Sequence, residues 1–231
     1  MFRVVWPVLF LVLALLLTLS GCAPAQQKAM QQMAEVIALP APVVTGQTSL
    51  EDALAGRRSS RSFAEQPLTL EALGQLLWAM QGQAVDARTG ATRTAPSAGA
   101  THPLSLYVVV TDVAGLEAGI YYYVQHEHGL RLEQAGEFAA ALAEAALNQT
   151  FMDDAAVNIV VAADFARTTG RYGERGRRYV YMEVGHATQN LLLQAEALGL
   201  KTVAVGAFHD YRVAELLATR RAPLMIIPTG N

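Results

Sequence analysis

The spacing of apolar residues divides the chain beyond residue 48 into helices and strands. Apolar positions three and four apart predict helices at 70–80, 137–149, 179–199 and 210–218. Ser49 and Thr69 are suited to cap helices, and the helix that Ser49 opens is expected to end at Gly56. Short runs rich in β-branched and aromatic residues predict strands at 104–111, 119–124, 130–132, 155–163, 201–208 and 224–228. The polar stretch 81–94 is expected to be a loop.

The first 22 residues have the pattern of an export signal. Arg3 precedes an apolar run from Val4 to Leu17, and small residues come before Cys22. The run is also near the length that spans a bilayer, so an uncleaved anchor helix is the alternative. The ending, Leu19 to Cys22, resembles the bacterial lipobox, in which the cysteine is lipidated and becomes the first residue of the mature protein.

This reading predicts three parts of the chain. A lipoprotein signal peptide covers 1–21, a flexible tether covers 22–48, and the folded domain covers 49–231. Cys22 is the only cysteine, so it cannot form an internal disulfide. We expect a lipid-anchored protein of the cell envelope. Ala23 after the cysteine favours the periplasmic face of the outer membrane if the organism has one.

Composition limits the function classes. The 231 residues, 52% of them hydrophobic, can bury one good core but not two once the N-terminus is removed. The net charge of -3 and a pI near 5.9 give no general attraction to nucleic acid. We expect one catalytic domain and no nucleic-acid partner.

A basic cluster follows the first helix. Three guanidinium groups and three hydroxyls lie between Arg57 and Phe63, where Arg58, Ser59 and Arg61 stand close together. Guanidinium offers a planar fork of donors that suits phosphate, and serine adds a short donor to the same oxygens. The alternative is a solvated basic turn.

A second segment has small residues between two prolines. Pro96 and Pro103 fix the backbone on either side of 97–100, where small side chains would let a flat ligand approach the main chain. The alternative is an ordinary turn before a strand. His102 could handle a proton, although a structural hydrogen bond is the favoured interpretation. His126 and His128 have no third ligand nearby, so no metal site is expected.

These blocks resemble one family. The cluster at 57–63, the segment 93–104, the strand 106–110 that follows it and the helix segment 185–193 occur in the order found in the FMN-dependent nitroreductase superfamily. The resemblance runs from about Leu50 to the end of the chain. Within that superfamily, the sequence most resembles the branch of dehydrogenases that oxidise thiazolines and oxazolines in ribosomal peptide products.

The resemblance implies an α+β fold, with a mixed, mostly antiparallel sheet flanked by helices. It implies a homodimer with one FMN at each of two interfacial sites, and a long helix at 179–199 in the dimer core. The implied cofactor-binding residues are Arg57, Arg58, Ser59, Arg61, Pro96, Ser97, Ala98, Gly99, Gly206 and Ala207. The backbone around Gly206 and Ala207 is expected to face flavin N5.

The implied catalytic residues are Arg171 and Tyr172. They match a Lys-Tyr-Gly segment of the azoline dehydrogenases, in which Arg171 replaces the lysine. A guanidinium stays protonated, so Arg171 can stabilise developing negative charge but not readily accept a proton, and Tyr172 is left as the acid or base. The alternative is a basic helix start that contacts solvent or a partner subunit.

The expected reaction is therefore a two-electron oxidation-reduction of a small-molecule or peptide substrate through FMN. An NAD(P)H-dependent nitroreductase is the alternative within the class. A flavin-binding module that has lost its chemistry is the alternative from another class.

Overall fold

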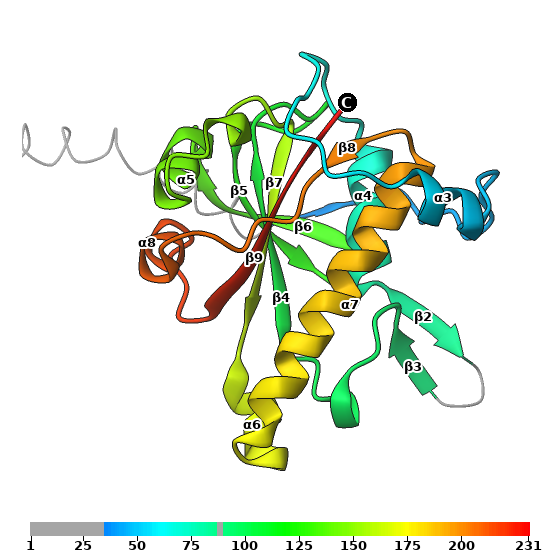
Figure 1. Ribbon diagram of the computed structural model, residues 1–231, viewed down its shortest axis with the longest axis vertical. Coiled ribbons are helices and arrows are strands. Elements are labelled where there is room, and N and C mark those ends of the chain that lie inside the picture. The colour runs from blue at the N-terminus through cyan, green and yellow to red at the C-terminus, as the bar shows by residue number, and fades with distance from the viewer. Residues whose placement is uncertain (1–34, 87–89) are drawn as a thin grey trace, which may run out of the picture. The chain divides into compact units, whose positions relative to one another are not determined.

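The computed structural model describes residues 35–86 and 90–231, of which residues 36–231 form one compact unit. Its centre is a seven-stranded sheet in the order β1-β6-β5-β4-β7-β9-β8, in which every strand pair is antiparallel (Figure 1). The strands are β1 (Val36–Ala38), β4 (Leu104–Val110), β5 (Gly119–Val124), β6 (Gly129–Ala135), β7 (Val157–Ala163), β8 (Lys201–Thr202) and β9 (Ala222–Gly230). The only parallel pairing among the described residues is an isolated bridge between Leu68 and Val113.

Helices cover both faces of this sheet. They are α3 (Leu50–Gly56), α4 (Leu70–Gln81), α5 (Ala139–Ala145), α6 (Phe165–Tyr172), α7 (Arg175–Ala197) and α8 (Asp210–Leu216). Apolar residues of α4 and α7 form one core with one face of the sheet, and residues of α5 and α8 form a second core with the other face. The expected α+β class, with helices flanking an antiparallel sheet, is confirmed.

The two central strands explain why there are two cores. All seven residues of β4 and all seven of β7 are buried. Side chains alternate along a strand, so Leu106 and Val108 enter the core with α7 while Tyr107 and Val109 enter the core with α5. A strand that is apolar on both sides needs a layer of helices on each side.

Two helix starts follow the predicted capping chemistry. The Ser49 side chain accepts a hydrogen bond from the backbone N–H of Asp52, and the Thr69 side chain accepts one from Ala72. Such caps satisfy donors that the first helical turn leaves free, and each contributes about 0.5–2 kcal/mol. Both capping predictions are confirmed.

The predicted tether over 22–48 is too long. β1 pairs with β6, Leu39 is buried, and the Leu39 N–H donates to the His128 carbonyl. Gln75 of α4 then bonds both backbone groups of Val43, at 2.8 and 2.9 Å. Residues 36–48 therefore belong to the domain. Their order comes from backbone pairing with distant segments, which hydrophobic periodicity does not reveal.

Among the predicted elements with different bounds, three differ in kind or lose part of their length. The expected loop 81–94 contains a hairpin of β2 (Gln83–Asp86) and β3 (Gly90–Arg93). The expected strand 201–208 is reduced to β8 and one bridge at Val205, and the helix expected at 137–149 ends at Ala145. Leu147 and Asn148 explain the last difference, because both adopt positive φ angles that a helix does not allow.

No helix among the described residues is long and apolar enough to cross a bilayer. The predicted export signal and Cys22 lie outside the described residues.

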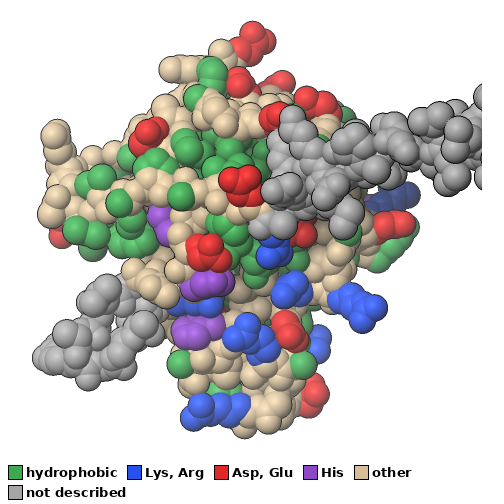
Figure 2. Space-filling model, turned by 180° about the vertical axis from the view of Figure 1, so that it is seen from behind, with side chains coloured by type: hydrophobic (Ala, Val, Ile, Leu, Met, Phe, Trp, Pro, Cys, Tyr) green, Lys and Arg blue, Asp and Glu red, His purple; other side chains and the backbone are tan. Residues whose placement is uncertain are grey.

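Charged side chains are unevenly spread over the surface. Arg and Lys side chains gather in the lower half of the face in Figure 2, toward the end of the molecule formed by α6 and the start of α7.

Candidate cofactor site

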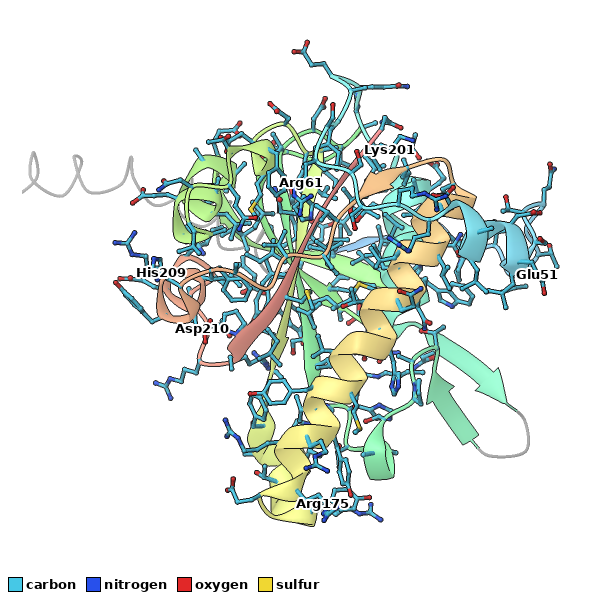
Figure 3. The ribbon with its side chains drawn as sticks, in the orientation of Figure 1. Glu51, Arg61, Arg175, Lys201, His209 and Asp210 are labelled. Atoms are coloured by element: carbon cyan, nitrogen blue, oxygen red, sulfur yellow. The ribbon has the colours of Figure 1, made fainter. Side chains whose placement is uncertain are left out.

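The basic cluster lies where α3 ends, beside β8. Arg57 is the C-cap of α3, and the Ser60 N–H donates to the Thr202 carbonyl at 2.9 Å. The Arg61 guanidinium lies over the Phe151 ring, 5.7 Å from its centre. Figure 3 shows Arg61 at the same end of the molecule as Lys201. In the described part of the chain, no carboxylate pairs with Arg57 or Arg61.

Arg58 is placed differently from its neighbours. Its Nη1 donates to the carbonyls of Ala55, Gly56 and Arg57 at 2.7, 3.0 and 2.9 Å. These carbonyls are acceptors that the end of α3 leaves unsatisfied, so the contacts of Arg58 are those of a helix cap. Its predicted contact with a cofactor stays a prediction.

Gly206 and Ala207 lie close to the same cluster. Gln149 donates from Nε2 to the Ala207 carbonyl at 2.9 Å. Phe151, two residues after Gln149, has the Arg61 guanidinium over its ring. Both residues are exposed, and a side chain added at Gly206 would meet nothing within 4 Å. The structure thus places five of the predicted residues on segments that Ser60, Arg61 and Gln149 link. We call this group the arginine half-site: Arg57, Ser59, Arg61, Gly206 and Ala207.

The other predicted residues meet elsewhere. Ala98 to Ala100 form a short 3₁₀ turn in which Gly99 has φ 57° and ψ 24°. Arg171 Nη1 donates to the Gly99 carbonyl at 3.0 Å, and a Cβ on Gly99 would overlap the Tyr172 hydroxyl. The predicted catalytic pair therefore touches the predicted flavin-lining segment. We call this group the turn half-site: Pro96, Ser97, Ala98, Gly99, Arg171 and Tyr172.

The Ser97 hydroxyl faces the interior of the protein. It accepts a hydrogen bond from the His102 N–H at 2.9 Å and hydrogen-bonds the carboxyl of Glu183, which is only 2% exposed. Its bonding capacity is used to hold the turn. Pro96, Gly99 and Ala100 are the exposed residues of this segment, so a ligand can reach the turn there.

Glu183 belongs to a buried polar cluster that sequence reasoning missed. Burial raises the pKa of Glu183, against the opposing effects of the Ser97 hydrogen bond and of the charges on Arg93 and Arg167. Burial also lowers the pKa of His102, and the same two arginines lower it further. Among the described residues, Glu183 Oε1 and His102 Nδ1 have no hydrogen-bond partner. A signal was present in the sequence, since Glu183 shares the apolar face of its helix with Val180, Val184, Ala187 and Leu191.

The two half-sites lie at opposite ends of α7. Gly176 at its start packs against Thr168 and Thr169 of α6, the helix that carries Arg171 and Tyr172. Glu196 at its end packs against Gly56 of α3, next to Arg57. The helix between them is about 30 Å long, at 1.5 Å per residue. One chain therefore does not bring its two half-sites to one ligand.

Comparison with known proteins shows which family the chain belongs to. The model of the nitroreductase family matches residues 54–231. The chain belongs to the nitroreductase family. A Methanocaldococcus jannaschii protein named as a nitroreductase, MJ1384, is 46% identical over 182 residues, covering 79% of this chain and 90% of that protein. The trifolitoxin-processing protein TfxB of Rhizobium leguminosarum bv. trifolii is 37% identical over 113 residues, covering 47% of this chain and 30% of that protein.

Among solved structures, a nitroreductase-family crystal structure from Ralstonia eutropha superposes with a TM-score of 0.73 at 28% identity. It covers 85% of this chain and 89% of that chain. Members of this family are oxidoreductases.

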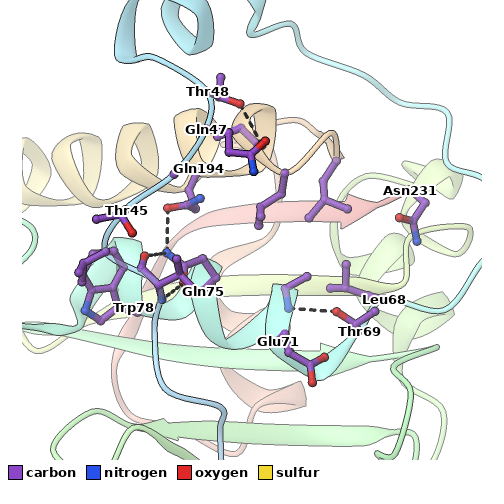
Figure 4. Close-up of a pocket in the computed structure, with 17 residues that line it drawn as sticks. Thr45, Gln47, Thr48, Leu68, Thr69, Glu71, Gln75, Trp78, Gln194 and Asn231 are labelled. Atoms are coloured by element: carbon purple, nitrogen blue, oxygen red, sulfur yellow. Dashed lines mark hydrogen bonds between the residues drawn. The ribbon is translucent and has the colours of Figure 1, made fainter.

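A cavity of about 820 Å³ is lined by no residue of either half-site. It is bounded by residues 43–48, the start of α4 and the end of α7 (Figure 4). Gln75 reaches across it to Gln194, with 3.2 Å between Nε2 and Oε1. Its lining contains no arginine or lysine. A phosphate group would find no cation there, so this cavity is not the cofactor site that the basic cluster predicts.

The buried carboxyl generates a test. Because its pKa lies above the usual value near 4.5, Glu183 contributes stability at low pH that is lost as pH rises through the folded-state pKa. Glu183→Gln keeps the shape and stays neutral, so we expect its stability relative to the parent to rise between about pH 4 and pH 8. Urea denaturation across this range measures the difference.

The matched control for this test is Glu174→Gln, because Glu174 is exposed on the same helix. If the free energy of unfolding changes with pH in the same way for the parent and Glu183→Gln, the raised pKa of the buried Glu183 carboxyl is contradicted.

Proposed function

We propose that this nitroreductase-family protein is an FMN-dependent oxidoreductase whose two cofactor sites are each completed by two chains. The observation that carries the proposal is the position of the half-sites at opposite ends of α7. The residues present fit the cofactor. Arg57 and Arg61 have no carboxylate partner among the described residues. Gly206 is exposed and has nothing within 4 Å of the place a Cβ would take, so its backbone is open to a flat ring.

The exposed face of α7 supports pairing of two chains. Met182 is 51% exposed, and Gly185 and Gln189 continue the same face. An exposed glycine inside a helix costs about 1 kcal/mol relative to alanine, and Gly185 has nothing within 4 Å of the place a Cβ would take. That cost is offset if the glycine lets a second helix approach closely. We therefore propose a homodimer in which the α7 helices cross near Gly185.

In this arrangement each site takes the arginine half-site of one chain and the turn half-site of the other. Arg57, Ser59 and Arg61 would hold the phosphate. Bound FMN supplies two-electron oxidation and reduction. Arg171 is fixed through the Gly99 carbonyl and keeps a positive charge beside the substrate. Tyr172 presents its hydroxyl at the same turn and can give or take a proton.

The proposed substrate is an organic compound, a small molecule or a peptide, that the protein oxidises. The similarity to the trifolitoxin-processing protein supports this dehydrogenase reading. The similarity to MJ1384, which is named as a nitroreductase, favours an NAD(P)H-dependent reductase instead. A flavin-binding module without chemistry is the third candidate, and a bound flavin that no reductant bleaches would favour it.

Shared sites predict complementation between two defective chains. Arg57→Ala removes a phosphate contact, which should weaken FMN binding by roughly tenfold to a hundredfold. Gly99→Val strains the turn and displaces Tyr172. Co-expressed with different tags and purified as a heterodimer, the two variants form one intact site. We expect about one FMN per heterodimer and about two per parent dimer, by visible absorbance.

The control is Arg58→Ala, which should lower thermal stability through the lost helix cap and leave FMN affinity within about twofold. A heterodimer as free of FMN as the two variant homodimers would show that each site lies within one chain. Circular dichroism confirms that each variant is folded.

The electron donor separates the two enzymatic readings. The proposed location outside the cytoplasm offers little NAD(P)H, so we expect NADH and NADPH to bleach the flavin slowly and only near millimolar concentration in anaerobic stopped-flow mixing. Rapid bleaching with micromolar affinity would instead establish the nitroreductase reading. Tyr172→Phe should slow reduction by the true substrate without loosening FMN.

We also propose that the chain is exported and anchored by lipid on Cys22. The support is the pattern of residues 1–22 alone. Acyl chains on the N-terminal cysteine would hold the mature protein on the membrane. We expect Cys22→Ala to move the protein out of the washed membrane fraction and to leave its N-terminus uncleaved before residue 22. A variant that stays on the membrane with an unchanged N-terminus would contradict lipidation.

A further inference from the structure

The surface next to the turn half-site is strongly basic. Residues 165–181 contain five arginines and a single glutamate, Glu174, in a chain whose net charge is -3. All five are exposed: Arg167, Arg171, Arg175, Arg177 and Arg178. We call this group the α6–α7 basic surface.

These arginines do not form ion pairs with carboxylates in the described part of the chain. Two of them lie over aromatic rings: Arg177 is 4.7 Å from the centre of the Phe165 ring, and Arg171 is 5.5 Å from that of Tyr172. Aromatic faces orient a guanidinium without neutralising it. Like charges three or four residues apart on a helix destabilise it by a few tenths of a kcal/mol. The surface therefore keeps uncompensated positive charge at an energetic cost.

The surface is also hollowed. A depression of about 480 Å³ is lined by Glu174, Arg175, Arg177, Arg178 and Tyr181. A second depression of similar size, against the start of α6, contains Arg220 and Arg221 beside Phe165, together with one carboxylate, Asp164. Both offer guanidinium donors together with an aromatic side chain. A carboxylate or phosphate on an organic molecule satisfies this combination, since each oxygen pair accepts the guanidinium fork.

We infer that the α6–α7 basic surface captures an anionic substrate, one that carries carboxylate or phosphate groups, and delivers it to Arg171 and Tyr172. This inference rests on the proposed function and adds the substrate class to it. Arg171 belongs both to the basic surface and to the turn half-site, through its bond to the Gly99 carbonyl. An anion held by Arg175 and Arg178 is therefore already beside the reacting end of the site. Clustered charge of one sign also raises the encounter rate with an oppositely charged ligand, by tenfold or more at low salt.

The test compares two variants that lose the same charge. Arg175→Gln/Arg178→Gln removes two cations from the basic surface. Arg131→Gln/Arg212→Gln removes two cations elsewhere, a half-buried one that pairs with Glu133 and an exposed one that pairs with Glu144. None of these four residues lies in either half-site, so FMN content should be unchanged in both variants.

The first readout measures binding and does not depend on turnover of the flavin. Citrate and pyrophosphate are titrated calorimetrically into the FMN-saturated protein and, for comparison, into the Arg57→Ala protein. In both proteins the proposed binding site for the FMN phosphate is blocked or weakened, so it should contribute little to anion binding. We expect one of the two anions to bind the parent, and its affinity to fall at least about tenfold in the Arg175→Gln/Arg178→Gln protein and less than about twofold in the control. The anion that binds tells whether carboxylate or phosphate is recognised.

The second readout uses the charge of an oxidant. Photoreduced enzyme is mixed with ferricyanide, a trianion, or with a ferrocenium cation, at several salt concentrations. We expect ferricyanide to react fastest at low salt with the parent, and to slow by about tenfold in the Arg175→Gln/Arg178→Gln protein but not in the control. Ferrocenium should show the opposite trend.

Equal anion affinity and equal oxidant rates in the two variants would overturn the inference. Purified protein that takes up no FMN would instead count against the proposed function, and the calorimetric titration would still decide whether the basic surface binds anions.

Discussion

The packing of α7 along the sheet is the contact on which the rest of the structure depends. Its inner face, with Val180, Val184 and Leu191, completes one of the two cores. Burial of these side chains stabilises the fold by an amount on the order of 1.5–3 kcal/mol each. The same helix fixes the positions of α6 at its start and α3 at its end. Its length therefore sets the separation between the two half-sites.

This geometry links assembly to chemistry under the proposed function. A chain that folds alone has a complete core but holds each cofactor contact on one side only. If two chains close a site between them, cofactor binding and dimer formation stabilise each other by mass action. The exposed face of α7, with its open glycine at 185, is where the structure leaves room for that second chain. Folding needs the inner face of this helix, and the proposed activity needs the outer face.

The turn half-site shows how the interior shapes a surface. Gly99, Ala100 and His102 all have positive φ, an unfavourable conformation for the two residues that carry side chains. The turn keeps this shape because Ser97 is held from inside by the His102 N–H and by Glu183. A buried carboxyl near two arginines thus supports the exposed backbone that the ligand is proposed to reach. Support of this turn, rather than packing of α7 against the sheet, accounts for a carboxyl at position 183 in the core.

Sequence alone determined the elements whose signals are local. The capped starts at Ser49 and Thr69, the buried central strands and the long helix ending near residue 199 follow from side-chain chemistry and periodicity, and the family resemblance gave the fold class. Tertiary structure decided what depends on contacts between distant segments. It placed residues 36–48 in the domain, turned Ser97 toward Glu183, and gave Arg58 the carbonyls of its own helix. It also placed the predicted cofactor residues in two groups at opposite ends of α7, a separation within one chain that only the length of a packed helix reveals.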